Sequence, residues 1–172
     1  MNVVAEEAGL DTSNAIALYK DMVYAIALTH TKNRADADDV FQEVFLTYHR
    51  KQPSFNDAEH RKAWLIVTTV YCARQLTTSS WRKKVIPLHE QAESQQDDHR
   101  FHFRTEEQDL VFTALQELPT KYRTVLHLFY FEDLSIAQIS LMLGIEVGTV
   151  KVQLFRARAL MRDKLKGEYF DE

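Results

Sequence analysis

Residues 135–162 read SIAQISLMLGIEVGTVKVQLFRARALMR and contain two predicted helices separated by a short turn. Ser135 followed by Gln138 forms a capping box, which predicts the start of a short helix at this point. Gly144 suits the left-handed position that commonly follows the end of such a helix. A longer, basic helix is then expected over about 147–166. A short helix, a glycine turn and a longer basic helix together predict a helix-turn-helix.

The last predicted helix has one face for the protein core and another for a partner. At about 100° per residue, an apolar stripe should point inward; it consists of Val150, Leu154, Ala157 and Met161. On the opposite side, Val152 and Phe155 stand among basic residues. Exposed apolar groups framed by arginines suit a DNA major groove, where they meet thymine methyls while the arginines meet guanine edges or phosphates. The pattern favours DNA contact over an ordinary solvated basic helix.

Three further helices are expected in the first half of the chain. The first covers about 14–29. The second begins at Asp36, which we expect to be its N-cap, and stops before Pro53. The third covers about 60–78 and includes a β-branched run at 66–70 that would also suit a buried strand. Because no second strand is available to pair with this run, we predict a helix.

The second half opens with a helix that ends before Pro119, followed by another over about 120–131. Between the halves, residues 89–105 are polar and without apolar period, as expected of a flexible linker. Only 4 glycines and 3 prolines leave little turn chemistry for a many-stranded sheet. The predicted fold is therefore all-α, with two small helical domains, 1–88 and 106–172, of which the second carries the helix-turn-helix.

Composition excludes several classes of protein. A single cysteine, Cys72, allows neither a disulfide framework nor a thiolate zinc site. We see neither a signal peptide nor an apolar run of about 20 residues, so a cytoplasmic location is expected. The net charge is −4, with acidic residues gathered at 36–43 and 93–109 and basic ones at 82–84 and 151–166. This segregation suits an acidic face for one partner and a separate nucleic-acid surface.

Two alternatives stay open on these observations alone. The acidic cluster at 36–43 could hold metal ions in a helical bundle, but bundle di-iron sites need Glu-x-x-His pairs, and Asp57-x-x-His60 is the nearest match. We therefore expect no metal, no cofactor and no catalytic residue. A helix-turn-helix repressor with an N-terminal effector or dimerisation domain would explain the last helix equally well.

Several motifs resemble the sigma-70 family of RNA polymerase sigma factors. The run DADDVFQEVFL at 36–46 resembles the family's polymerase-binding helix, and KAWL at 62–65 resembles the start of the helix that melts the −10 promoter element. Seven short motifs in the second half resemble the family's −35-binding domain: Leu118-Pro119, Tyr122-Arg123, Val125-Leu126, Leu134-Ser135, Gly144-Ile145, Val147–Lys151 and Arg156–Arg158. With only these two domains, the chain is similar to the extracytoplasmic function (ECF) group.

This resemblance implies partners and site residues. The partners would be core RNA polymerase, promoter DNA and a membrane-linked anti-sigma factor, without a small-molecule substrate. The polymerase-binding residues would be Asp38, Asp39, Gln42 and Glu43, which would engage the coiled coil of the largest subunit. The −10 DNA-binding residues would be Ser54, Phe55, Asn56, Arg61, Lys62, Trp64 and Tyr71. The −35 DNA-binding residues would be Thr149, Lys151, Val152, Phe155, Arg156 and Arg158.

Overall fold

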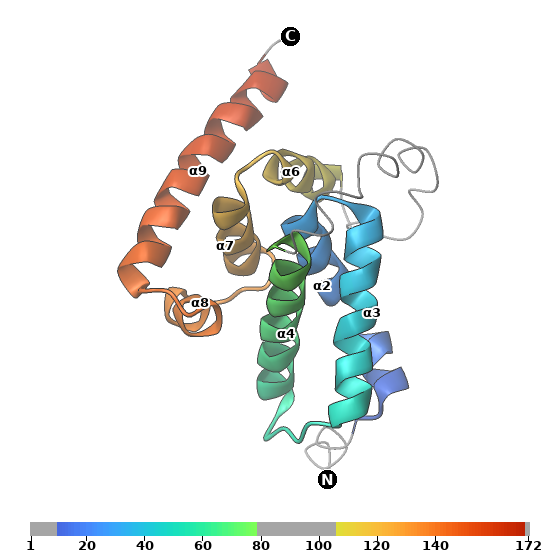
Figure 1. The fold of residues 1–172 in the computed structure, drawn as a ribbon. Coiled ribbons are helices and arrows are strands. Elements are labelled where there is room, and N and C mark those ends of the chain that lie inside the picture. The colour runs from blue at the N-terminus through green and yellow to red at the C-terminus, as the bar shows by residue number, and fades with distance from the viewer. Residues whose placement is uncertain (1–9, 79–105, 171–172) are drawn as a thin grey trace.

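Helices account for nearly all regular structure in the computed structural model, which describes residues 10–78 and 106–170. In chain order the helices are α2 (Thr12–Thr31), α3 (Arg34–Lys51), α4 (Ala58–Thr78), α6 (Glu106–Gln116), α7 (Thr120–Tyr130), α8 (Ile136–Leu143) and α9 (Val147–Phe170). Figure 1 shows α2, α3 and α4 as one bundle, with α7 and α8 on one side of it and α9 beyond them. No strand occurs within the described ranges, so the predicted all-α fold is confirmed. The linker expected at 89–105 lies outside the described residues.

The second helix of the bundle begins earlier than predicted. Asn33, not Asp36, is the N-cap of α3, because its Oδ1 accepts a hydrogen bond from the backbone N–H of Asp36 at 3.1 Å. Asp36 lies in the first turn, where its negative charge is favoured by the helix dipole. An amide oxygen caps a helix as well as a carboxylate does. The sequence thus offers two caps, and the chain uses the upstream one.

The β-branched run at 66–70 is helical, as predicted, and lies in the middle of α4. Ile66, Thr69 and Val70 are buried there. The hydroxyl of Thr69 donates to the backbone carbonyl of Leu65 at 2.6 Å, so it has a partner in the helix. Burial of this face of α4 outweighs the low helix propensity of these residues.

The helix-turn-helix forms as its sequence predicts. The backbone N–H of Ser135 donates to Gln138 Oε1 at 2.9 Å, and the backbone N–H of Gln138 donates to Ser135 Oγ at 3.1 Å. Gly144 follows α8 with φ of 66°, in the left-handed region that favours glycine. The predicted inward stripe of α9 is buried along its length, at Val150, Leu154, Ala157 and Met161.

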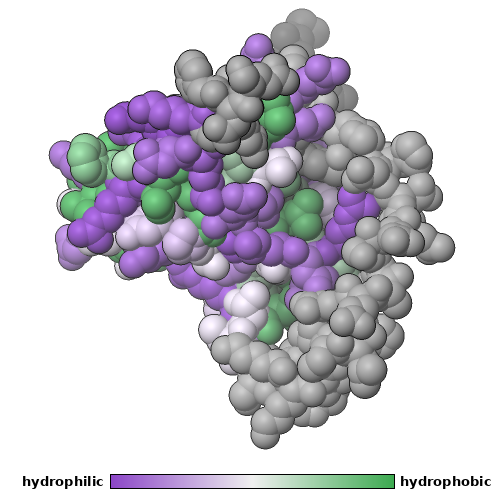
Figure 2. Space-filling view, turned by 90° about the horizontal axis from the view of Figure 1, so that it is seen from above, coloured by the Kyte–Doolittle hydropathy of each residue, from purple (hydrophilic) through white to green (hydrophobic). Residues whose placement is uncertain are grey.

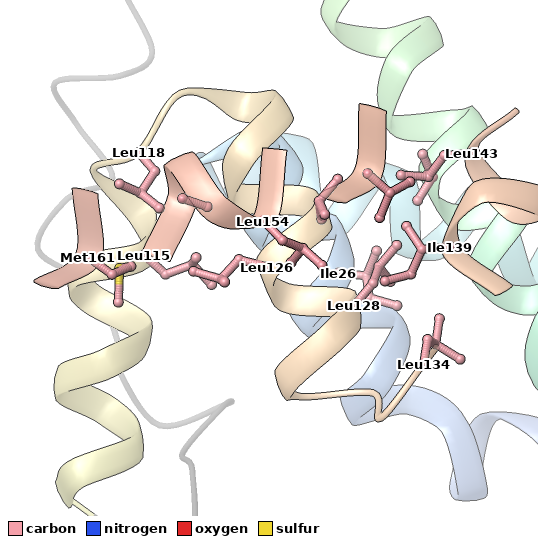
Figure 3. Packing of buried hydrophobic residues seen from close by; sticks show 14 of the residues in the cluster. Ile26, Leu115, Leu118, Leu126, Leu128, Leu134, Ile139, Leu143, Leu154 and Met161 are labelled. Atoms are coloured by element: carbon pink, nitrogen blue, oxygen red, sulfur yellow. The ribbon is translucent and has the colours of Figure 1, made fainter. Parts of the chain in front are cut away.

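The two halves of the chain share a hydrophobic core. Ile26 of α2 packs in one cluster with Leu128 of α7 and Ile139 of α8 (Figure 3). Ile66 and Val70 of α4 belong to the same cluster. A second cluster lies within the first half, between α2, α3 and α4. The second half of the chain is therefore packed against α2 and α4 rather than held apart from them.

Buried hydrogen bonds also cross between the halves, and we call this set the seam: Thr29, His30, Thr124, His127 and Arg123. The guanidinium of Arg123 donates to the backbone carbonyls of Thr29 and His30, the latter at 2.9 Å. These carbonyls lie at the end of α2, where helical partners run out. The ring of His127 meets the hydroxyl of Thr29 at 3.0 Å, and the ring of His30 meets that of Thr124 at 3.2 Å. The seam fixes how α7 sits on α2.

Candidate nucleic-acid interface

The outer face of α9 presents apolar side chains to solvent. Phe155 is 74% exposed and Val152 48% exposed. Thr149, Lys151 and Arg156 are also exposed around them. Figure 2 shows the molecule from above, with hydrophobic side chains standing among hydrophilic ones on its surface. Five of the six residues expected at the −35 element are therefore accessible around this outer face.

Arg158, the sixth residue, points elsewhere. Its Nε donates to the hydroxyl of Tyr130 at 2.8 Å, and its guanidinium lies 5.2 Å from the ring centroid of Phe129. Together with Met161 it lines an apolar groove of about 650 Å³ between α6, α7 and α9. These contacts hold Arg158 against α7 and separate it from the outer face of α9.

A depression of about 300 Å³ lies where the first turns of α7 and α9 meet. Its lining includes Lys121 and Tyr122, which the sequence did not single out, beside Val152 and Arg156. A hydrogen bond from Arg156 lowers the pKa of Tyr122. In the sequence, Lys121 is an ordinary solvated residue at a helix start, and nothing local shows that α7 meets α9 there.

The acidic residues of α3 gather on one face, as their spacing predicts. Asp39, Gln42 and Glu43 are exposed and Asp38 is half-buried. Glu43 Oε1 accepts a hydrogen bond from Arg50 Nη2 at 3.0 Å, an exposed ion pair that costs little to break. This face remains accessible to a large basic partner.

Of the residues expected at the −10 element, two are buried: one in the loop between α3 and α4, and one in the first turn of α4. Phe55 is 6% exposed and packs against the rings of Tyr48 and Trp64. Arg61 is 1% exposed, with its guanidinium 5.3 Å from the ring centroid of Phe55. Its Nε and Nη2 are buried without a hydrogen-bond partner. In this arrangement neither side chain reaches the surface, although the neighbouring Ser54 does.

The other −10 residues lie in this loop and along α4. Asn56 is exposed on the loop, and Tyr71 is 61% exposed on α4. Trp64, seven residues before Tyr71, shares its helical face and is half-buried. Lys62 lies at the boundary with the second half, where its Nζ donates to the backbone carbonyl of Glu132 at 3.1 Å.

Within residues 10–78 and 106–170, no three His, Cys, Asp or Glu side chains come close enough together to hold a metal ion. Among the helices of those same ranges, none combines the length and apolar character required to cross a bilayer.

Family models match both halves of the chain, in order. The model described as Sigma-70 region 2 matches residues 15–84, which include α3, α4 and all but the first three residues of α2. The model described as Sigma-70, region 4 matches residues 108–161, which include the helix-turn-helix. The two matched ranges cover most of the chain and contain all of its candidate site residues.

Two curated relatives are similar over most of their length. The RNA polymerase sigma factor SigV of Bacillus subtilis is 29% identical over 150 residues, covering 87% of this chain and 88% of SigV. The ECF RNA polymerase sigma factor SigW of the same organism is 27% identical over 169 residues, covering 90% and 88%. A chain in the co-crystal structure of the sigma factor RpoE with the anti-sigma factor NepR from Bartonella quintana has the same fold. It aligns with a TM-score of 0.64 and 22% identity, covering 93% of this chain and 98% of that one.

Proposed function

Because the chain belongs to the ECF group of the sigma-70 family, it is a transcription initiation factor that binds RNA polymerase, and we propose how its surfaces divide this work. The acidic face of α3, with Asp39 and Glu43 at its centre, binds the core enzyme. The loop at 52–57 and the start of α4 hold the −10 element. The outer face of α9, centred on Phe155, reads the −35 element. The observation that carries this division is the exposure of Phe155 among cations on the second helix of a helix-turn-helix.

Sigma factors are in general not enzymes, and we propose that this chain has no catalytic activity of its own. It would act in the cytoplasm, where polymerase and chromosome meet. The solved relative is a complex with an anti-sigma factor, and a partner of that kind, membrane-linked, is proposed for this chain too. The repressor alternative is not favoured, because the first half of the chain matches sigma-70 region 2.

The arrangement of the two halves has to change during this work. The −10 and −35 elements are, by their names, about 25 base pairs apart, which is about 85 Å along B-DNA. Lys62 contacts Glu132, and the chain from Glu132 to Phe155 follows a path no longer than about 50 Å through α8 and the first turns of α9. The closed form therefore cannot place both surfaces on one promoter. We propose that 1–88 and 106–172 separate as two domains, joined by 89–105, when polymerase and promoter bind.

Transcription in vitro tests the proposed function. Core polymerase with this protein should produce a discrete transcript from a cognate promoter, identified by selection from a random promoter library. Core polymerase alone should give only non-specific products. A gel shift with promoter DNA, run with and without core enzyme, distinguishes the protein from a repressor, because a repressor binds its operator without polymerase. Tight specific binding by the free protein, unchanged by core enzyme, would overturn the proposal.

A further inference from the structure

The depression between α7 and α9 brings together two cations from different helices. Lys121 lies in the first turn of α7, and Arg156 lies in the third turn of α9. Both side chains are exposed, and both line the same hollow of about 300 Å³. The described residues around this hollow include no carboxylate; the others are Tyr122, Gly148, Thr149, Val152 and Gln153.

The side chain of Tyr122 joins the two cations. Arg156, and to a smaller extent Lys121, lower the pKa of the Tyr122 phenol, which lines the hollow beside both cations. The Nζ of Lys121 also lies 5.0 Å from the centroid of the Tyr122 ring, within range of a cation–π contact. A guanidinium carries five N–H donors and an ammonium three, so one phenol oxygen leaves most of these donors available.

This geometry suits an anion. Two like charges held around one neutral oxygen repel each other, and no acidic side chain lines the hollow to compensate them. A phosphate supplies both the missing charge and the oxygen acceptors that match an arginine and a lysine. Val152 lines the hollow and also lies on the outer face of α9, so a duplex seated on that face runs past it.

We propose that Lys121, Tyr122 and Arg156 form a binding site for one backbone phosphate of the −35 duplex, with Tyr122 as the residue that positions the two cations. The proposal rests on the proposed function of α9. It gives Arg156 a role in affinity rather than in base readout. Reading of bases is left to Lys151, Val152 and Phe155.

Binding of the reconstituted holoenzyme to promoter DNA, measured against salt concentration, tests the site. Losing one phosphate contact lowers the slope of log K against log salt by about 0.9. Lys121→Ala and Arg156→Ala should each show this change. The loss of affinity between 50 and 200 mM salt should then be about threefold smaller for each variant than for the unaltered protein. Tyr122→Phe keeps the ring and removes only the hydroxyl, and it should lower both slope and affinity by a smaller amount. Lys164→Ala is the matched control, because Lys164 is a cation of the same helix that pairs with Glu117 at 2.8 Å.

A panel of −35 sequences completes the test. All three variants should weaken binding to every sequence alike and leave the order of preference unchanged. The site is overturned if Lys121→Ala behaves like Lys164→Ala, or if any of the three variants alters preference at a single base pair. It is also overturned if Tyr122→Phe lowers the melting temperature but leaves the salt slope unchanged, since that is a purely structural role. Promoter-specific binding by the unaltered holoenzyme, measured in parallel, shows whether the proposed function itself stands.

Discussion

Lys62 on α4 and Glu132, just after α7, lie face to face across the boundary between the two halves. Lys62 Nζ is 3.6 Å from Glu132 Oε2, and it also donates to the backbone carbonyl of Glu132 at 3.1 Å. The other carboxylate oxygen of Glu132 lies 3.7 Å from His127 Nε2, which is part of the seam. A cation expected to bind −10 DNA is therefore engaged inside the protein when the halves are closed.

This pair predicts a cross-link that reports closure. A zero-length carbodiimide reagent joins lysines to carboxylates in contact, so the free protein should yield both Lys62–Glu132 and Lys164–Glu117. The second pair lies within one half, at 2.8 Å, and serves as the internal control. In the complex with core polymerase and promoter, peptide mapping should recover Lys164–Glu117 and lose Lys62–Glu132. Recovery of both cross-links from that complex would contradict the opening.

The seam should weaken as the pH falls. Burial in the seam, followed by the charges of Arg123 and Arg74, lowers the pKa of His30 from 6.5 to about 4. His30 is therefore neutral when the halves are closed and binds a proton more readily when they open or unfold. Between pH 6.5 and 4, protonation of His30 stabilises the open or unfolded form relative to the closed one. At the acidic end of this range it destabilises the closed form by up to roughly 3 kcal/mol. Small-angle scattering should show the radius of gyration rising over this range, and less steeply in His30→Gln.

Polymerase binding should depend on the acidic face of α3. Changing Asp39 and Glu43 together to Lys should weaken binding to core polymerase roughly tenfold or more, because like charges would then meet across the contact. Both residues are exposed, so circular dichroism should show unchanged helicity. Asp21→Lys, at an exposed acidic residue of α2, is the control and should leave co-purification with core unchanged.

Base preference at the −35 element should depend on Phe155. Phe155→Ala should cost roughly 1–3 kcal/mol for the preferred base pair and relax preference at one position, because a contact to a base edge is lost. Holoenzyme transcription across a library of −35 variants measures this. Leu141→Ala removes another exposed apolar side chain, on the first helix of the helix-turn-helix, and should leave the profile unchanged. An identical profile for wild type and Phe155→Ala would place the recognition surface elsewhere.

The two glycines of the helix-turn-helix should respond to alanine in opposite directions. A Cβ at Gly144 or at Gly148 would meet nothing within 4 Å, so neither substitution creates a clash. Gly144→Ala should still cost about 1 kcal/mol, because its φ of 66° is strained for any residue with a Cβ. Gly148→Ala should stabilise the protein by less than about 1 kcal/mol, because Gly148 lies in the first turn of α9 and alanine has the higher helix propensity. Thermal unfolding of the two variants measures both signs.

The features that sequence predicted well are those set by neighbours along the chain. The capping box at Ser135, the glycine turn and the inward stripe of α9 all depend on residues within a few turns of one another. The N-cap of α3 shows the limit of such reasoning, since Asn33 and Asp36 are both good caps and only the folded chain selects one. Phe55, Arg61 and Arg158 carry residue types that suit DNA contact. Phe55 and Arg61 are buried, and Arg158 is held by its hydrogen bond to Tyr130. These contacts involve residues that are distant in the chain, so no local pattern reveals them.

The seam was missed for the same reason. Arg123 belongs to a motif that resembles the −35-binding domain, yet its donors reach the last carbonyls of α2, more than 90 residues earlier in the chain. Thr29 and His30 look in sequence like the polar end of an amphipathic helix. Their role depends on α7 approaching that end, which is a property of the whole fold.

The shared core gives the closed form a dependence on temperature. Separating the halves exposes Ile26, Ile66 and Val70 to water, so the heat capacity rises on opening. The hydrophobic contribution to closure is then largely entropic near room temperature and fades on cooling. Because apolar contacts hold the two halves together, cooling by itself weakens closure. The fraction of molecules in the open form should therefore rise as the temperature falls.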